Sequence, residues 1–195
     1  WWGDLPTYFG HHLTSVPVRG NVICGGPEKV VYRADWRSMD KRGHPRTMEA
    51  NERVVDQLDI ADLPNERAHR YNFPQPSKGF VVYRVLGDPR KPRRGLFDAG
   101  RVIPGGFVER AQLRPPRRAG RLMVRIAPDR EYRVFVRAAG RDIGLLRAEP
   151  ARAVWQELAV ALPGDLPHPF DLELETQSGD AVHFHVWVLE EKDPE

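Results

Sequence analysis

Alternation of apolar and polar residues is the clearest signal in this chain, and it is most regular near the C-terminal end. Residues 181–189 read AVHFHVWVL and predict a strand, because strand side chains point alternately to two faces. One predicted face is wholly apolar: Val182, Phe184, Val186 and Val188. The other carries two imidazoles and an indole: His183, His185 and Trp187, followed by Leu189. We expect this strand to close a sheet, with its second face either a packing layer or a ligand platform.

Similar short segments recur through the last two-thirds of the chain. Seven more strands are predicted at residues 80–86, 107–113, 121–126, 131–137, 143–146, 153–162 and 171–176. Residues 90–106 are basic and rich in turn-forming residues, and they predict a loop. Short strands at even spacing, each apolar on one face, predict a mainly β fold: a two-sheet antiparallel β-sandwich of jelly-roll type.

The first 79 residues lack this regularity. They contain short strand candidates at 29–33 and 53–60, a long polar loop at 35–51 and a short helix from about Pro64 to His69. We therefore predict two parts: an irregular, partly helical N-terminal segment, 1–79, that packs on a sandwich formed by 80–195. Trp1 and Trp2 are expected to be buried against a neighbouring surface.

Composition narrows the class of protein. With 41% hydrophobic and 29% charged residues, the chain resembles an ordinary globular protein. The single cysteine, Cys24, excludes an internal disulfide and a zinc site built from several thiolates. Because the chain begins with Trp1, we expect it to be part of a longer product or to follow a removed leader.

Charge is unevenly distributed. Residues 84–125 hold twelve Arg or Lys against three acidic residues, whereas residues 162–195 hold nine acidic residues against one Lys. Pairing across facing strands explains this asymmetry, and a patch for an anionic partner is the alternative. The arginine-rich runs DPRKPRRG at 88–95 and RPPRRAGR at 114–121 favour that alternative. Nucleic acid is disfavoured as a partner, because aromatic residues that would stack on bases are not interleaved with these arginines.

Several of these segments together carry a resemblance to known proteins. WQELAVALP at 155–163, DLELE at 171–175 and AVHFHVWVL at 181–189 are similar to the second half of galactose-binding-like, carbohydrate-binding jelly rolls. The unit also resembles soluble domains at the C-terminal end of bacterial multi-spanning membrane proteins of glycosyltransferase type. The resemblance covers about residues 80–189 and implies a carbohydrate-binding fold in an extracytoplasmic part of a larger bacterial protein.

A sugar-stacking platform is the candidate site. Aromatic rings cover the apolar faces of sugars while polar neighbours bind the hydroxyl groups. The predicted ligand-binding residues lie on two strands: His183, His185, Trp187, Phe135, Arg133 and Arg137. Cover by the N-terminal segment is the competing interpretation of the Trp187 face. The leading function is therefore a non-catalytic module that binds or positions a carbohydrate or anionic glycan, periplasmic or at the cell surface, with no cofactor.

Other chemistries were weighed on the same grounds. His183 and His185 have the spacing of two metal ligands, with His11 and His12 as further donors, but no third ligand is identified, and structural histidines are preferred. An enzyme of hydrolase or transferase type would use the N-terminal third, where one cluster combines carboxylates with an imidazole: Asp56, Asp59, Asp62, Glu66 and His69. Cys24 before Gly25 and Gly26 is a candidate nucleophile. A structural protein-interaction domain is the third alternative.

Overall fold

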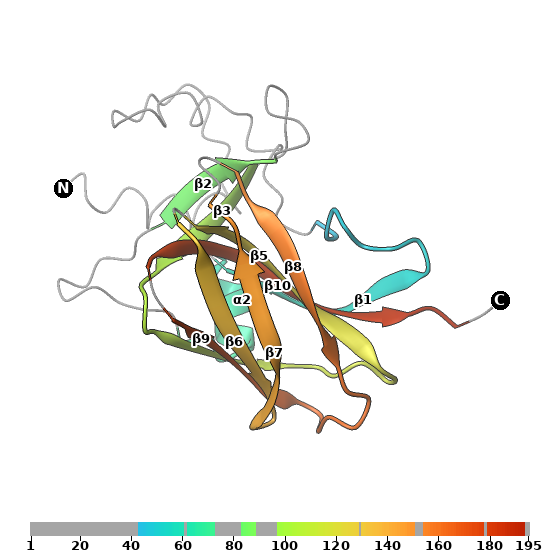
Figure 1. Cartoon of the computed structure of the whole chain (residues 1–195). Coiled ribbons are helices and arrows are strands. Elements are labelled where there is room, and N and C mark those ends of the chain that lie inside the picture. Colours follow the sequence, from blue (N-terminus) through green and yellow to red (C-terminus); the bar gives the residue numbers. More distant parts are fainter. Residues whose placement is uncertain are drawn as a thin grey trace.

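The chain forms two antiparallel sheets that face each other (Figure 1). The computed structural model describes residues 43–60, 62–72, 83–88, 97–128, 130–150, 154–177 and 179–193. Sheet A has the order β2 (Tyr83–Gly87), β3 (Phe97–Ile103), β10 (Ala181–Glu191), β5 (Gly120–Pro128) and β8 (Gln156–Leu162), and β1 (Glu52–Asp59) pairs with β10. Sheet B has the order β4 (Val108–Leu113), β9 (Phe170–Thr176), β6 (Tyr132–Ala138) and β7 (Arg141–Ala148).

The connectivity is that of a jelly roll. Four antiparallel pairs are nested in the sequence, with β6 and β7 innermost, then β5 with β8, β4 with β9, and β3 with β10. From the inside outward these pairs alternate between sheet B and sheet A. The folded ribbon thus wraps a core between the four-stranded sheet B and the six-stranded sheet A, which β1 and β2 extend. This confirms the predicted mainly β sandwich.

The main core lies between the two sheets. Alternation along each strand supplies it, as on β6, where Tyr132, Val134 and Val136 are buried and Arg133 and Phe135 face outward. Sheet A contributes the same pattern from β5, and its inward side chains have no exposure: Leu122, Val124 and Ile126. The inward faces of β5 and β6 are those that the sequence predicts.

The closing strand β10 is central in sheet A and differs from the expected regular alternation. A register shift with β5 lies between His183 and His185. As a result Ala181 and Val186 pack in the main core, whereas Val182 and Phe184 belong to a separate cluster on the other side of the sheet. The predicted single apolar face of Val182, Phe184, Val186 and Val188 is therefore wrong: the bulge exchanges the two faces midway.

Two strands of sheet A flank β10 on one edge. β3 pairs with 181–183 and β1 pairs with 185–191, while β5 occupies the opposite edge along almost the whole length. β3 falls within 90–106, which the sequence analysis assigned to a loop. Gly100 explains why that segment looked unlike a strand, since a Cβ there would collide with the backbone carbonyl of His183. β1 is the strand predicted at 53–60.

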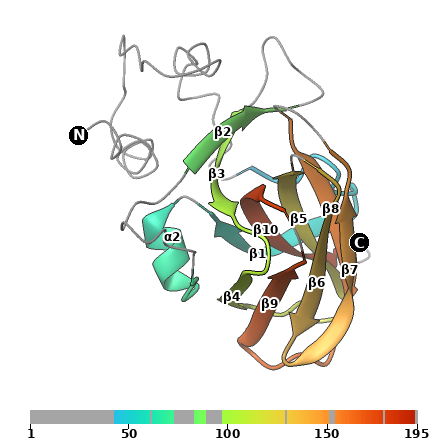
Figure 2. The same ribbon diagram turned by 60° about the vertical axis from the view of Figure 1, so that its left-hand side comes forward.

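Helix α2 (Leu63–Ala68) stands outside the two sheets (Figure 2). Pro64 lies in its first turn, as predicted. The segment after the helix lies along the free edge of β4, because Gln112 donates its backbone N–H to His69 and Asn72 donates to Arg110. These bonds satisfy edge groups that would otherwise be open to another chain.

Candidate ligand-binding site

The three predicted site residues of β10 are fully buried. His183 points between the sheets, where its ring contacts Tyr132 edge-on at 5.7 Å and its Nδ1 lies 2.6 Å from Glu109 Oε2. His185 and Trp187 lie on the outer side of sheet A and stack with ring centroids 4.8 Å apart. The bulge thus sends the two histidines to opposite sides of the strand, and the spacing that suggested a pair of metal ligands does not bring the rings together.

A charged network surrounds His185 beneath the outer surface of sheet A. Arg125 donates to Asp98 at 2.6 Å and to Glu157 at 2.7 Å, and its guanidinium carbon lies over Trp155 at 3.8 Å and over Trp187 at 4.8 Å. His185 Nε2 lies 3.0 Å from Asp98 Oδ2. The four charged members of this cluster, here called the Arg125 network, are Arg125, Asp98, Glu157 and His185.

Protonation of His185 is part of that network. Burial disfavours the charged ring, but the carboxylates of Asp98 and Asp59 outweigh burial and raise the pKa of His185 to about 9. The network holds two carboxylates, Asp98 and Glu157, and only one guanidinium. The charged imidazole of His185 supplies the second positive charge. The network is thus a set of mutually compensated buried charges.

Residues 43–48 form a cap over this network. Trp187 donates its indole N–H to the carbonyl of Gly43 at 3.1 Å, and the backbone N–H groups of Arg46 and Thr47 donate to the Glu157 carboxylate at 2.9 and 2.8 Å. Met48 packs against the cluster that contains Trp187. The expected open platform of His183, His185 and Trp187 is therefore corrected: Trp187 has no exposed surface, and part of the N-terminal segment covers it.

The other three predicted site residues lie on a different surface. Phe135, Arg133 and Arg137 project from β6 on the outer side of sheet B, so they cannot share one face with Trp187. Phe135 is 37% exposed. Arg133 pairs with Glu131 at 2.7 Å, and Arg137 pairs with Asp142 and Glu175, each at 2.8 Å. The structure thus separates the predicted site into two halves.

The carboxylate cluster proposed for an enzyme is also divided. Glu66 is buried and forms a two-point ion pair with Arg101, with one of its bonds 2.6 Å long. His69 instead lies 3.3 Å from Asp56. His69 and Asp56 of the proposed cluster thus lie together, whereas Glu66 pairs with Arg101. Cys24, Trp1, Trp2, His11 and His12 lie outside the described residues.

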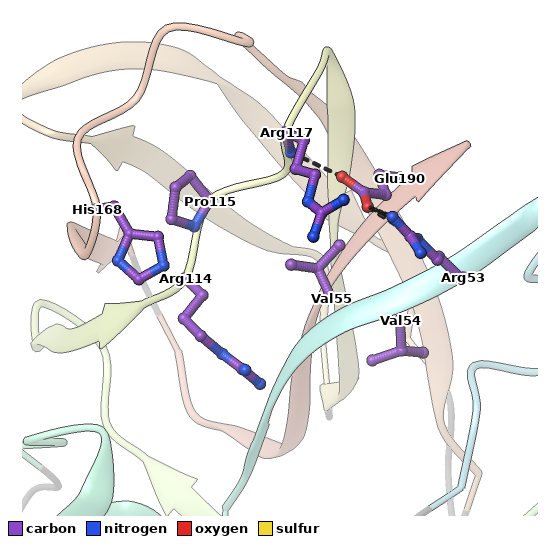
Figure 3. A pocket seen from close by; sticks show the side chains of 8 residues that line it. All are labelled: Arg53, Val54, Val55, Arg114, Pro115, Arg117, His168 and Glu190. Atoms are coloured by element: carbon purple, nitrogen blue, oxygen red, sulfur yellow. Dashed lines mark hydrogen bonds and ion pairs between the residues drawn. The ribbon is translucent and has the colours of Figure 1, made fainter. Parts of the chain in front are cut away.

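A pocket of about 340 Å³ opens where two strands and two connections of the sandwich meet (Figure 3). β1, β10, the β4–β5 connection and the β8–β9 connection all contribute to it. We call it the arginine pocket, after three of its eight lining residues, which are Arg53, Val54, Val55, Arg114, Pro115, Arg117, His168 and Glu190. Figure 3 shows Arg53, Arg117 and Glu190 at one end and His168 with Arg114 at the other.

Ion pairs fix two of the three arginines. Arg53 donates to Glu190, and Arg114 donates to Asp56 both from its guanidinium at 3.1 Å and from its backbone N–H at 2.7 Å. The Arg117 backbone N–H donates to Glu190 at 2.7 Å. Among the described residues, no carboxylate pairs with the Arg117 guanidinium. Within the described part of the chain, the Arg117 guanidinium is therefore a pocket cation that no carboxylate pairs with.

Asp56 holds Arg114 from behind the pocket wall. Burial raises the pKa of this carboxyl, but hydrogen bonds from His69 and Arg114 outweigh burial and keep the pKa well below its usual range. Asp56 is therefore ionised at neutral pH and anchors Arg114, while much of the Arg114 side chain, 61% of it, remains exposed. The pocket wall is thus preorganised rather than loose.

The sequence signalled part of this pocket. Arg114, Pro115 and Arg117 belong to the arginine-rich run at 114–121, which was interpreted as a site for an anionic partner. Arg53, His168 and Glu190 were missed, because they are distant in sequence and meet only through the pairing of β1 with β10 and the return from β8 to β9.

No protein-family model and no curated protein sequence matches the chain. Solved structures that resemble it include a family 6 carbohydrate-binding module at 13% identity, covering 69% of this chain and 93% of that one, with a TM-score of 0.46. Another is the CsCBM6-3 module of Clostridium stercorarium, determined with cellobiose, at 12% identity, covering 71% and 94%, with a TM-score of 0.42.

A third similar structure is an enzyme. It is a family 43 arabinoxylan arabinofuranohydrolase of Bacillus subtilis, in complex with cellotetraose, at 12% identity and a TM-score of 0.46. The match covers 73% of this chain but only 28% of the enzyme. The fold is a β-sandwich. Its assignment rests on the strand pairing described above, and likeness at this level assigns no ligand.

Within the described part of the chain, no group of three or more His, Cys, Asp or Glu side chains is arranged to hold a metal ion. No helix among the described residues is long and apolar enough to span a bilayer.

Proposed function

We propose that this chain is a non-catalytic binding module and that the arginine pocket binds the acidic unit of an anionic glycan. The observation that carries the proposal is the uncompensated guanidinium of Arg117 in a preformed pocket whose other cations are held in place by carboxylates. Guanidinium groups recognise carboxylates through two parallel hydrogen bonds.

The pocket combines charge with apolar surface in the way a sugar requires. Val54, Val55 and Pro115 line it together with the arginines. Sugar rings place C–H groups against apolar side chains while their polar substituents are bound by a few directed groups. The volume of about 340 Å³ is at the lower end of the range of ligand pockets, roughly 300–1,000 Å³. The ligand named for several of the solved neighbours is also a saccharide.

The absence of a catalytic pair supports binding rather than hydrolysis at this site. Most glycoside hydrolases use two carboxyl groups on either side of the bond that is cleaved. Among the described lining residues, Glu190 is the only carboxylate, and both of its oxygens accept hydrogen bonds, from Arg53 and from the backbone of Arg117. Glu190 therefore serves to position the arginines.

Calorimetric titration of the full chain tests this function. We expect galacturonic acid and its tetramer to bind, and galactose and its tetramer to bind at least tenfold more weakly. Arg117→Ala should reduce the affinity for the acidic sugars about tenfold, since a hydrogen bond to a charged group contributes about 1.5–3 kcal/mol. Arg147→Ala, an exposed arginine on sheet B, is the matched control. Equal binding of acidic and neutral sugars, or binding of neither, would overturn the proposal.

The outer side of sheet B is a second candidate surface for the same class of ligand. Phe135 is the exposed large apolar side chain among the described residues, and Arg133 and Arg137 flank it on β6. A ring that stacks on a sugar needs such exposure. Its weakness is that both arginines already pair with carboxylates.

We also propose an extracytoplasmic location, as part of a larger bacterial membrane or secreted protein. Acidic glycan polymers are found mainly outside the cytoplasm, so a module that binds them acts there. Fractionation of cells that express the full-length parent protein tests this location, and a purely cytoplasmic signal would contradict it.

A further inference from the structure

A second hollow, of about 170 Å³, adjoins the arginine pocket. Three of its lining residues also line the arginine pocket: Arg53, Arg117 and Glu190. Three others line this hollow alone, from the β4–β5 connection and from the end of β10 and the residues after it: Arg118, Glu191 and Asp193. The two hollows therefore adjoin and share Arg53, Arg117 and Glu190 as a common wall.

The two hollows differ in charge. The arginine pocket combines three arginines and His168 with one carboxylate. The second hollow balances three arginines with three carboxylates. Within it Arg118 pairs with Asp193 at 3.0 Å, which removes most of the attraction for an anion. The first hollow favours a negatively charged group, and the second favours a neutral group rich in hydroxyls, because carboxylates accept hydrogen bonds from hydroxyls and repel other carboxylates.

Glu190 fixes the boundary between them. It is 5% exposed, with one oxygen accepting from Arg53 and the other from the backbone N–H of Arg117. Glu190 is therefore a fixed part of the wall that the two hollows share.

Size supports a ligand that uses both hollows. The second hollow lies below the roughly 300 Å³ at which ligand pockets begin, so it is too small to act as an independent site. As an extension of the arginine pocket it adds room for a further unit.

We infer that the ligand spans both hollows and is a saccharide of at least two units, with an acidic unit in the arginine pocket and a neutral unit beside Glu191 and Asp193. This inference rests on the proposed function. It adds the minimum number of sugar units in the ligand and the positions of the acidic and the neutral unit. It predicts selection against a second acidic unit in the neighbouring position.

Three probes test the inference on the full chain: galacturonic acid, a disaccharide of galacturonic acid and rhamnose, and digalacturonic acid. We expect the mixed disaccharide to bind five- to tenfold more tightly than galacturonic acid alone, and digalacturonic acid to gain less than twofold. Glu191→Gln should reduce the preference for the mixed disaccharide over digalacturonic acid at least threefold and leave galacturonic acid binding unchanged. Glu149→Gln, at an exposed glutamate directly after β7 that lines neither hollow, is the control.

The outcomes separate this inference from the function on which it rests. If all three probes bind with equal affinity and Arg117→Ala weakens them all, the two-hollow ligand is wrong and the arginine pocket stands. If Glu191→Gln leaves the preference intact, the second hollow plays no part. If no probe binds, the proposed function fails, and the two-unit ligand fails with it.

Discussion

The outer sides of the two sheets carry similar side chains in opposite settings. On sheet A, Arg125 lies between two tryptophans and pairs with two carboxylates, and its side chain has no exposure. On sheet B, Arg137 also pairs with carboxylates, from Asp142 and Glu175, but it is one-third exposed beside Phe135. The difference is the cap of residues 43–48, which excludes water from one face and not from the other.

The cap changes what each ion pair contributes. In water, an exposed pair is screened and contributes about 0–1 kcal/mol. Beneath the cap, forming the pair mostly offsets the cost of removing the charges from water, whereas losing one partner leaves the rest buried and uncompensated. The same residue types are thus nearly neutral on sheet B and essential to integrity on sheet A.

Of the changes proposed here, removal of Arg125 should cause the largest loss in the free energy of unfolding. Arg125→Met keeps side-chain volume but leaves Asp98 and Glu157 without their guanidinium. We expect a loss of about 3–5 kcal/mol in the free energy of unfolding, measured by urea denaturation. The matched variant on sheet B, Arg137→Met, should cost about 1 kcal/mol or less. Similar losses for the two variants would show that the cap does not separate the two environments.

The second-largest loss in the free energy of unfolding is expected when the pH is raised, because His185 in the Arg125 network then loses its proton. The folded-state pKa of His185, about 9, is above its ordinary value of 6.5. The stabilisation is therefore fully present below pH 6.5 and is lost as the pH rises through 9. Its size is about 3 kcal/mol, at 1.36 kcal/mol for each unit of pKa difference. Denaturation between pH 6 and 9.5 measures it.

The control for this pH effect is His185→Gln. This variant should be less stable at pH 6 and show a much smaller decline towards pH 9.5. His69, whose pKa Asp56 raises despite burial, leaves a residual slope of the same sign. Sheet B supplies a contrast, because its four strands contain no histidine. An unchanged slope in His185→Gln would exclude the Arg125 network as its source.

The fold was more predictable from sequence than the site, and β6 shows why. Its side chains alternate without interruption, so Tyr132, Val134 and Val136 could be assigned to the core from residue type alone. The same assignment is wrong for β10, because a bulge between His183 and His185 exchanges the two faces of the strand. One extra residue in a strand has no reliable sequence signature, since nothing in AVHFHVWVL marks where the pairing shifts.

Buried charged residues are a second feature that could not be predicted from the sequence. Sequence reasoning treats charged residues as surface groups, yet Arg125, Asp98 and Glu66 are buried. Their burial depends on partners supplied by distant segments, such as Arg101 for Glu66. The arginine pocket depends likewise on contacts that local patterns do not encode, although the charge of its 114–121 segment was visible.

Opening of the cap should have a smaller effect than loss of Arg125. Glu157→Gln removes the negative charge that accepts from the backbone of Arg46 and Thr47. The change also removes one of the two carboxylates that pair with Arg125. We expect a loss of about 1–3 kcal/mol, because the neutral amide oxygen still accepts hydrogen bonds and Arg125 keeps its pair with Asp98. Amide hydrogen exchange at Arg46 and Thr47 should accelerate at least tenfold more than exchange in β6. Glu175→Gln on sheet B is the control, and equal acceleration there would contradict a local role for the cap.

The smallest effect on stability is expected on the exposed side, at Phe135. Phe135→Ala removes a ring that is already 37% exposed, so no closed cavity forms, and the free energy of unfolding should change by about 1 kcal/mol or less. Its effect on ligand binding decides between two surfaces. If the arginine pocket is the site, Phe135→Ala binds galacturonic acid as the wild type does, while Arg117→Ala does not. The reverse result would move the site to sheet B, because among the described residues Phe135 is the exposed large apolar side chain, while Trp187 remains beneath its cap.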